Sequence, residues 1–230
     1  MNKILFTEAD REILFHIPLF RDLPTNIKHS LIEKLDFSLY EFSQGEQIAV
    51  QGKICNHLYV LLKGRLQVDF IDGLGNKIII ENIIPPRAFA TPHLFGKNNC
   101  LPASFTALED GVLFTATRES AFALISAYPD LLRSFFHVSG CCNKCTTIRL
   151  RLLSYKNVRS RFISFLLDNL PPNSDMVELI HNQAELAEYL NITRPALSKE
   201  INSMIREGLI TKKNKAFRLI DISRLKSYVL

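Results

Sequence analysis

The residues of this sequence best suited to chemistry form a polar, cationic face between residues 194 and 206. Arg194, Ser198, Lys199 and Asn202 lie on one side of a segment whose apolar residues recur at helical spacing. An arginine side chain can donate two hydrogen bonds to guanine, and asparagine can form a comparable pair with adenine. A helix that carries such a face has the groups needed to read bases in the major groove of DNA.

Two short helices joined by a tight turn are predicted to position this face, between Asn182 and Leu209. Thr193 can cap the second helix with its hydroxyl, and Pro195 falls in the first turn, where its missing N–H is tolerated. Apolar residues give both helices a buried side. They are Leu186, Ala187 and Leu190 in the first helix and Leu197, Ile201, Met204 and Ile205 in the second, with the turn at Asn191 and Ile192.

A small β-wing is predicted directly after the second helix, which Gly208 ends. A strand begins at residues 209–211, a basic tip follows at residues 212–215, and a second strand returns at residues 216–220. The tip would place Lys212 and Lys213 against DNA phosphates. The alternative interpretation is an ordinary helical hairpin with a solvated face. The turn, the cationic face and the wing together favour DNA binding.

The composition fits a globular protein that can bind a polyanion. The chain has 230 residues, 47% of them hydrophobic, and a formal net charge of +5, which permits a nucleic-acid partner without requiring one. No run of 18 apolar residues and no signal peptide is found, so we expect a cytoplasmic protein without a membrane partner. No Ser-His-Asp spacing, phosphate-binding glycine loop or pair of carboxylates is found either, so we expect no enzymatic activity.

The N-terminal part is predicted to be a roll of short β-strands. Strands are expected at residues 36–42, 48–52, 57–72 with a break near Lys63 and Gly64, 77–83, 104–108 and 111–117. The less regular residues 85–102 interrupt the roll, where a ligand pocket can form, and a plain loop is the alternative. Helices are expected at residues 24–35 and 118–127.

One long helix of about 27 residues is predicted from Pro129 onward. Residues spaced by four and three form a seam for a parallel helix pair, namely Leu131, Phe135, Val138, Cys142, Cys145, Arg149 and Leu152. This seam predicts a homodimer, and the alternative is a helix buried within its own chain. The domains are then an effector sensor at residues 1–128, a dimerisation helix and hinge at residues 129–156, and a winged helix-turn-helix at residues 157–230, capped by Asn157.

Cysteine and histidine side chains offer alternatives to a simple ligand sensor. Cys141, Cys142 and Cys145 are close together on the long helix, and in a symmetric dimer their thiols can bind a metal or an iron–sulfur cluster, or cross-link on oxidation. The simpler interpretation is small apolar packing. His93 or His137 can be an axial haem ligand, although an isolated histidine is more often a surface or core residue. The cofactor and any metal are therefore left undetermined.

Nearly the whole chain resembles the Crp/Fnr family of bacterial transcription regulators. The similar segments are GEQIAVQG, HLYVLLKGRLQV, YPDLL and LAEYLNITRPALSKEI. The resemblance implies an α+β fold, with an N-terminal β-roll of the cyclic-nucleotide-binding type (a double-stranded β-helix), a long dimerisation helix and a C-terminal winged helix-turn-helix. It also implies that Arg194, Ser198 and Lys199 read bases and that Thr193 and Lys213 contact phosphate. Pro195 stands where the family often has glutamate, so the family's half-site sequence is not transferred.

The effector segment departs from the cyclic-AMP receptors of this family. Those proteins hold the cyclic phosphate with a Gly-Glu-Leu segment and a later Arg-Ser pair, and here Thr91-Pro92 and residues 101–103 stand at about those positions. Because the phosphate would lack a cation, we expect that cyclic AMP is not the effector. Thr146 and Thr147 match hydroxyl positions that contact the purine. The candidate pocket residues are Arg87, Phe89, Thr91, His93, Ala103, Ser104, Thr146 and Thr147, and Arg87 and Lys97 are sources of charge for a different anion.

Together these observations predict a homodimeric, sequence-specific DNA-binding transcription regulator whose β-roll senses an unidentified effector. The expected partners are a second copy of the chain, double-stranded DNA with a palindromic operator, a small molecule and, as a candidate, RNA polymerase. Two alternatives stay open. One is a redox, gas or metal sensor that works through Cys141, Cys142 and Cys145 or through haem, and the other is a ligand-binding module whose winged domain makes protein contacts.

Overall fold

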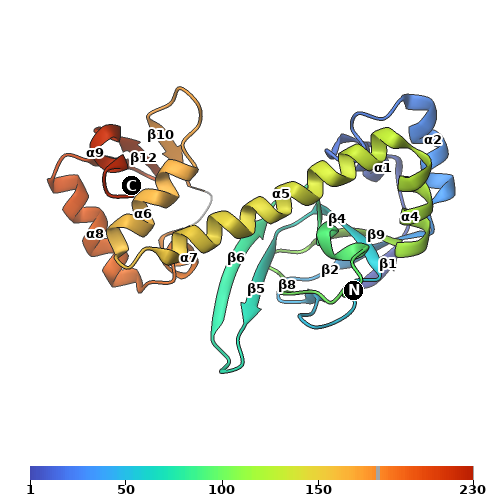
Figure 1. The fold of residues 1–230 in the computed structure, drawn as a ribbon, viewed down its shortest axis with the longest axis horizontal. Helices are drawn as coiled ribbons and strands as arrows, with labels where there is room; N and C mark the ends of the chain where they lie inside the picture. The colour runs from blue at the N-terminus through green and yellow to red at the C-terminus, as the bar shows by residue number, and fades with distance from the viewer. Residues whose placement is uncertain (180–181, 230) are drawn as a thin grey trace. The chain divides into compact units, whose positions relative to one another are not determined.

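The computed structural model describes residues 1–179 and 182–229 and divides into two compact units. The first unit is Met1–Thr146 and the second is Thr147–Leu230. The long helix α5, Pro129–Ser154, contributes residues to both units (Figure 1). Its 26 residues agree with the predicted length of about 27. Among the described residues, no helix combines the length and the apolar character needed to cross a membrane.

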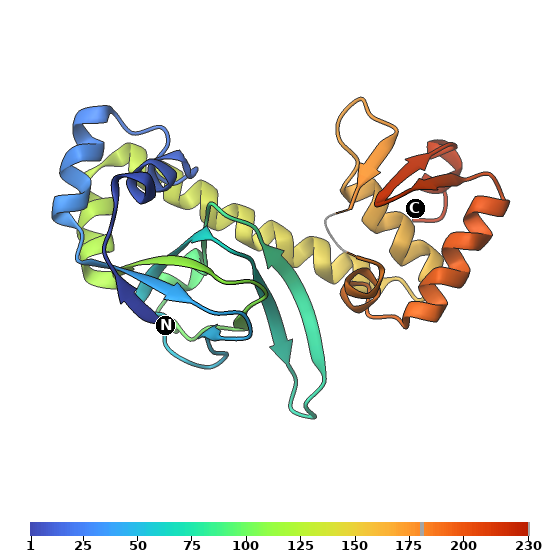
Figure 2. The ribbon, with the colours of Figure 1, turned by 180° about the vertical axis from the view of Figure 1, so that it is seen from behind.

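Two antiparallel sheets form the β-roll of the first unit, seen from both sides in Figures 1 and 2. The five-stranded sheet has the order β1-β2-β9-β4-β7, and the four-stranded sheet has the order β3-β8-β5-β6. Their bounds are β1 Asn2–Ile4, β2 Phe37–Phe42, β3 Gln47–Ala49, β4 His57–Lys63, β5 Leu66–Ile71, β6 Lys77–Ile83, β7 Arg87–Phe89, β8 Ser104–Ala107 and β9 Gly111–Thr117. The predicted α+β fold with an N-terminal roll is thereby confirmed.

The break between β4 and β5 also lies where the sequence predicts it, and glycine is required there. Gly64 has φ +86°, in the left-handed region, and an added Cβ would lie 2.7 Å from the carbonyl oxygen of Asp110. Only glycine reaches this conformation and this close approach without strain. The break lets the chain pass from the five-stranded sheet to the four-stranded one, which creates the two layers of the roll.

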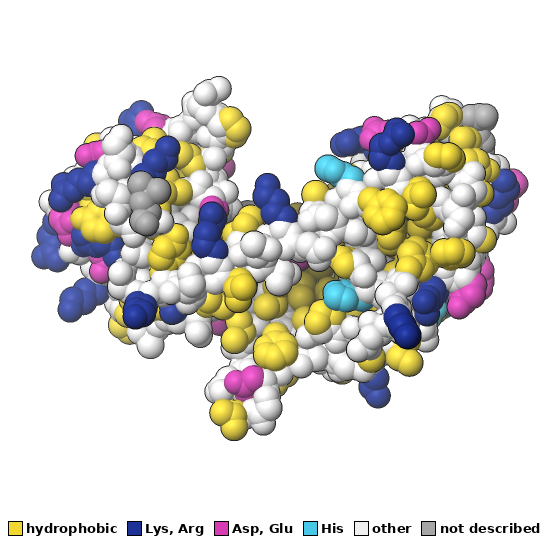
Figure 3. Space-filling view, viewed as in Figure 1, with side chains coloured by type: hydrophobic (Ala, Val, Ile, Leu, Met, Phe, Trp, Pro, Cys, Tyr) yellow, Lys and Arg dark blue, Asp and Glu magenta, His cyan; other side chains and the backbone are white. Residues whose placement is uncertain are grey.

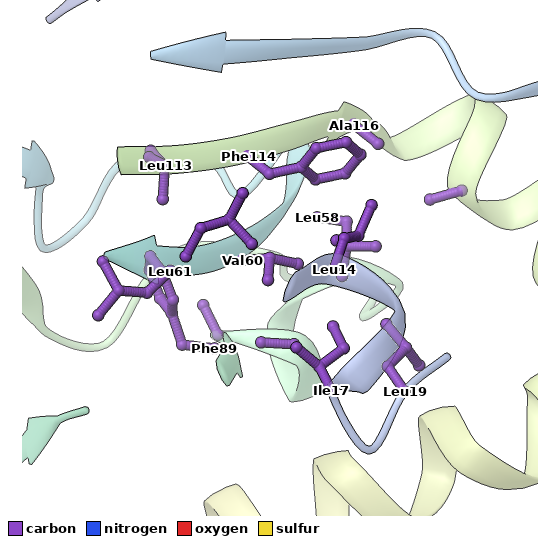
Figure 4. Packing of buried hydrophobic residues seen from close by; sticks show 14 of the residues in the cluster. Leu14, Ile17, Leu19, Leu58, Val60, Leu61, Phe89, Leu113, Phe114 and Ala116 are labelled. Atoms are coloured by element: carbon purple, nitrogen blue, oxygen red, sulfur yellow. The ribbon is translucent and has the colours of Figure 1, made fainter. Parts of the chain in front are cut away.

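Helices pack on the roll and complete its core. They are α1 Glu8–His16, α2 Thr25–Lys34, α3 Thr91–Leu94, α4 Arg118–Ala127 and the first part of α5. The predicted helices at residues 24–35 and 118–127 are therefore confirmed, and α3 lies inside the irregular stretch 85–102. Figure 4 shows Leu14 of α1 and the adjoining Ile17 among buried side chains of β4 and β9, including Val60 and Phe114.

Helices and a three-stranded sheet form the second unit. The elements after α5 are α6 Val158–Asp168, β10 Met176–Glu178, α7 Gln183–Tyr189, α8 Arg194–Arg206, β11 Ile210–Lys213, β12 Ala216–Leu219 and α9 Ile222–Lys226. Asn157 caps α6 as predicted, since its side-chain oxygen accepts a hydrogen bond from the Ser160 amide at 2.7 Å. The sheet order is β10-β12-β11. Strands β11 and β12 are the predicted wing, and β10 is a strand that the sequence pattern did not reveal.

Two details predicted for this unit are wrong. Ile205 is 37% exposed rather than buried, because Met204, Ile201 and Leu197 already fill the core side of α8. Lys212 and Lys213 are not the tip of the wing but the end of β11. The turn between the strands instead contains Asn214, whose φ of +55° is a conformation that asparagine tolerates.

The seam predicted along α5 faces the chain's own cores, so it is wrong as a surface for a second chain. Its buried members are Leu131, Phe135, Val138, Arg149 and Leu152. A side chain with almost no accessible surface within one chain is not free to contact another. The large apolar residues of α5 that do stay exposed are Leu132, Phe136 and Leu150.

Candidate functional site

Local capping and a tight turn set the direction of α8, which carries the cationic face. The hydroxyl of Thr193 accepts a hydrogen bond from the Ala196 amide at 3.4 Å, so Thr193 is the N-cap that the sequence predicts. In the preceding turn, Asn191 has φ +53°, a left-handed conformation in which asparagine is enriched. The Ile192 amide donates to the carbonyl oxygen of Ala187 at 3.0 Å. The helix pair is thus specified by contacts within a few residues.

An ion-pair network ties α8 to α6. The guanidinium of Arg159 donates to the two carboxylate oxygens of Glu207 at 2.6 and 2.8 Å and also pairs with Glu200. The hydrogen bond from Arg159 is the main cause that lowers the pKa of Glu207, and the Ser203 hydroxyl adds to it. Arg159 therefore fixes the position of α8 on α6 through these ion pairs.

The opposite face of α8 presents donors that the rest of the unit does not use. Thr193, Arg194, Lys199 and Asn202 are exposed, and Ser198 is half-buried. Across residues 1–179 and 182–229, neither Arg194 nor Lys199 takes part in an ion pair, whereas Arg159 and Arg218 do. Exposed cationic and amide donors on one helix face are the groups that contact phosphates and base edges.

The wing adds two more exposed cations. Lys212 and Lys213 lie on β11, and the Lys212 ammonium is 5.7 Å from the centre of the Phe217 ring. Figure 3 shows Lys and Arg side chains, in dark blue, distributed over the face of this unit. The structure therefore places all seven residues predicted to contact DNA on α8, its cap and β11 of a single unit.

A cavity of about 250 Å³ lies in the first unit between the roll and α5. Its apolar walls include Val68, Phe70, Ile80, Phe89, Ala103 and Phe105, and its polar lining consists of Glu81, His93, Cys142, Asn143 and Thr146. The rings of Phe89 and Phe105 are 4.9 Å apart between centres. The cavity is thus a mainly apolar space with a few polar groups, which is the usual composition of a small-molecule site.

The charges at this cavity compensate each other. Two nitrogens of Arg87 donate to the two carboxylate oxygens of Glu81 at 2.9 and 3.3 Å. Although burial alone would lower the pKa of Arg87, the charge of Glu81 and its hydrogen bonds raise it above the ordinary value, which favours the charged form of Arg87. Burial lowers the pKa of His93, which favours its neutral form. The Glu81 carboxylate of the lining is therefore paired with an arginine that lies outside the lining.

The structure separates the predicted effector residues into two groups. Phe89, His93, Ala103 and Thr146 line the cavity. The other four do not line it: Arg87 pairs with Glu81, Thr91 is buried beside Cys142, Ser104 accepts a hydrogen bond from the Gln51 amide, and Thr147 belongs to the second unit. Lys97 is exposed and also lies outside the lining.

Several lining residues were not predicted from the sequence. Val68 and Phe70 point to the same side of β5 because side chains alternate along a strand, so their spacing was a usable signal. Glu81 offered no such signal, since its importance depends on the pairing with Arg87. Asn143 gave no signal either, because it is one of several exposed polar residues of the long helix.

The three neighbouring cysteines of α5 have different surroundings. Cys141 lies 3.9 Å from the Nε2 atom of His137, Cys142 lies 3.8 Å from the Thr91 hydroxyl, and Cys145 lies 3.8 Å from an Arg87 nitrogen. Burial raises the pKa of the Cys145 thiol. Among the described residues, no group of three or more His, Cys, Asp or Glu side chains is arranged to hold a metal ion.

Comparison with known proteins agrees with this architecture. Residues 39–128 match the family described as cyclic nucleotide-binding domain, and residues 160–228 match the Crp-like helix-turn-helix domain. The cyclic AMP receptor protein of Thermus thermophilus is 26% identical over 77% of this chain and 84% of its own.

Two solved structures share the fold. A CooA mutant from Carboxydothermus hydrogenoformans superposes with a TM-score of 0.70 at 19% identity, covering 88% of this chain and 90% of its own. FixK2 from Bradyrhizobium japonicum superposes with a TM-score of 0.64 at 16% identity, covering 84% of this chain and 98% of its own.

Proposed function

The chain belongs to the Crp/Fnr family of transcription regulators, and we propose that it works as a homodimer that binds a specific operator and senses a small molecule other than cyclic AMP. The observation that carries the operator-binding part is the exposed face of α8, whose Arg194 and Lys199 have no ion-pair partner within the described residues. In this proposal Arg194, Ser198, Lys199 and Asn202 read base edges.

The phosphate contacts come from the flanks of the reading face. Thr193 lies at the N-terminus of α8, where backbone amides and the helix dipole favour an anion. Lys212 and Lys213 extend from β11 as exposed point charges. These contacts fix the position of the protein along DNA and carry the salt dependence of binding, whereas the α8 face carries the sequence preference.

The exposed side of α5 supports a second copy of the chain as the dimer partner. Phe136 and Leu150 are 67% and 71% exposed. They belong to a run spaced by four and three along the exposed side, consisting of Leu132, Phe136, Ser139, Asn143, Thr146 and Leu150. This is the heptad spacing of a parallel helix pair. Two-fold symmetry then predicts a palindromic operator.

The same helix offers a route from the effector to the dimer. Asn143 and Thr146 line the cavity and also belong to the exposed heptad run. A molecule in the cavity therefore touches residues of the exposed heptad run. Binding shifts the dimer between two arrangements only if the molecule has different affinities for them. In this scheme residues 1–128 sense, residues 129–156 couple and residues 157–230 bind DNA, with RNA polymerase as a candidate later partner.

The charge of the cavity argues against cyclic AMP. A cyclic phosphate is an anion, and Arg87, the cation that contacts Glu81 of the lining, is bound by both carboxylate oxygens of that residue. A charged hydrogen bond contributes about 1.5–3 kcal/mol, so a phosphate that lacks such bonds and meets the Glu81 carboxylate loses much of its affinity.

A fluorescence anisotropy titration tests the DNA-binding part. The full chain is titrated into labelled genomic duplexes and random duplexes at two salt concentrations. We expect some genomic fragments to bind at least about a thousandfold more tightly than random DNA at the same salt. Equal affinity for all duplexes at both salt concentrations would overturn the proposal of operator recognition.

A further inference from the structure

We infer that the cavity beside α5 takes an uncharged, mainly aromatic molecule of about ten non-hydrogen atoms. The role of this molecule as the effector rests on the proposed function, whereas its binding to the cavity does not depend on that function. The volume of the cavity limits the size of the ligand. A cavity of about 150 Å³ in another protein holds benzene, so the volume of about 250 Å³ found here suits one fused ring system or a substituted single ring.

The walls of the cavity favour a flat apolar ligand. Phe89 and Phe105 form an aromatic pair with centres 4.9 Å apart and planes tilted by 35°. Ile80 and Val68 supply aliphatic surface beside them. A ligand ring can pack at an edge or in an offset stack against such aromatic faces. Burial of its apolar surface then supplies most of the affinity.

The ion pair between Glu81 of the lining and Arg87 selects against charge of either sign. The Glu81 carboxylate lies in the lining, so it repels an anion. Its two oxygens are already occupied by Arg87, so it offers little to a cation. Burial lowers the pKa of His93, which keeps that side chain neutral at neutral pH. An uncharged ligand avoids both the repulsion and the cost of separating the Glu81–Arg87 pair.

Polar groups of the lining can still orient such a ligand. Thr146 and Asn143 are exposed residues of α5 that border the cavity, and His93 borders it from α3. A hydroxyl, amide and imidazole can each exchange one or two hydrogen bonds with a neutral donor or acceptor. A ring with one N–H or O–H group therefore fits the lining better than a pure hydrocarbon.

Titration calorimetry of the full chain with three probes tests this inference. Indole is the uncharged aromatic probe, indole-3-carboxylate is its anionic analogue, and cyclic AMP is the larger anion. We expect indole to bind at least about tenfold more tightly than either anion. Tighter binding of indole-3-carboxylate or cyclic AMP, or no detectable binding of indole, would overturn the inference.

Two variants locate the binding. Ala103→Phe fills the cavity, so it should weaken indole binding by at least about tenfold, whereas the matched Ala123→Phe, on an exposed position of α4, should not. Glu81→Gln releases the Arg87 guanidinium. It should improve binding of indole-3-carboxylate by about tenfold and leave indole unchanged, a gain that misfolding cannot produce.

The outcomes separate this inference from the proposed function. Unchanged indole affinity in a folded Ala103→Phe protein, together with no gain in Glu81→Gln, would place the ligand elsewhere and reject the inference while operator binding stands. Loss of operator selectivity in the anisotropy titration would reject the proposed function and leave the ligand class of the cavity intact.

Discussion

Arg194 is the arginine among the four residues proposed to read bases. It is the first residue of α8, it is exposed, and its guanidinium has no ion pair within the described part of the chain. Arg206 is exposed at the other end of the same helix. The two arginines thus share a helix and a charge but differ in their position relative to the proposed reading face.

Arg194→Ala should therefore weaken binding to the preferred operator by about 1–3 kcal/mol and relax the preference at one base pair. Arg206→Ala is the control and should change operator binding by much less. Anisotropy titrations against the operator and against single-base variants of it measure both effects. If Arg194→Ala reduced the affinity for operator and random DNA equally, Arg194 would be a phosphate contact instead.

His93, which lines the cavity, should make the stability of the folded protein depend on pH. Burial lowers its pKa in the folded protein, so the unfolded chain takes up a proton first when the pH falls below about 6.5. The free energy of unfolding should consequently decrease as the pH falls through that value. His93→Gln should make the decrease shallower, as followed by urea unfolding with circular dichroism. An identical pH profile in the variant would contradict this origin.

Some lining residues of the cavity could be predicted from the sequence, but the pairing of its charged groups could not. Phe89, His93, Ala103 and Thr146 were predicted as pocket residues and line the cavity. The charge balance was not predicted, because it depends on Glu81 and Arg87 meeting from β6 and β7. A single sequence can identify an arginine near a pocket, but it does not reveal which carboxylate forms an ion pair with that arginine.

At the scale of elements, α8 and α5 differ in how far their surroundings can be predicted. The cap at Thr193, the turn at Asn191 and the buried stripe of α8 depend on residues close in sequence, and they agree with the prediction except at Ile205. Helix α5 has two apolar sides that are offset by one residue, at Leu131 and Leu132. Spacing alone could not tell which side packs on the chain's own roll.

The exposed side of α5 makes a prediction about assembly. Phe136→Glu combined with Leu150→Glu should convert the proposed dimer to a monomer, because charges would replace two exposed apolar residues of the heptad run. Lys144→Glu, also exposed on α5 but outside the run, is the control and should leave the dimer intact. Light scattering after size-exclusion chromatography gives the masses. A soluble, folded double variant that remains dimeric would exclude this side as the interface.

Arg149 near the end of α5 makes a prediction about stability. It is only 2% exposed, and within the described residues its three guanidinium nitrogens have no hydrogen-bond partner. The guanidinium stacks 4.4 Å from the centre of the Tyr189 ring, and burial lowers its pKa to about 10. Such a charge is costly to bury, since no acceptor compensates its lost hydration.

Arg149→Met keeps a long flexible side chain and removes the charge. It should raise the free energy of unfolding by about 1 kcal/mol or more, measured by urea denaturation, while Arg206→Met at an exposed site should change it little. A marked loss of stability in Arg149→Met would mean that the guanidinium makes a favourable contact beyond its stack on Tyr189.

The whole molecule combines three parts in one chain. The roll contains an apolar cavity. Residues Asn143 and Thr146 of α5 line this cavity and belong to the exposed heptad run. The second unit carries the cationic face of α8. The order of these parts along the chain was predicted from the sequence and agrees with the matched domains at residues 39–128 and 160–228. The coupling between them is a proposal about the dimer.

Selection of duplexes from a random pool by the purified full chain tests operator recognition by a symmetric dimer, because it needs no knowledge of the effector's identity or of the regulated genes. We expect enrichment of a two-fold symmetric sequence whose half-site centres are about one turn of DNA apart, roughly 34–36 Å. We also expect the Arg194→Ala protein to lose preference at one symmetric pair of positions. Recovery of sequences without symmetry, or no enrichment above the starting pool, would contradict operator recognition by a symmetric dimer.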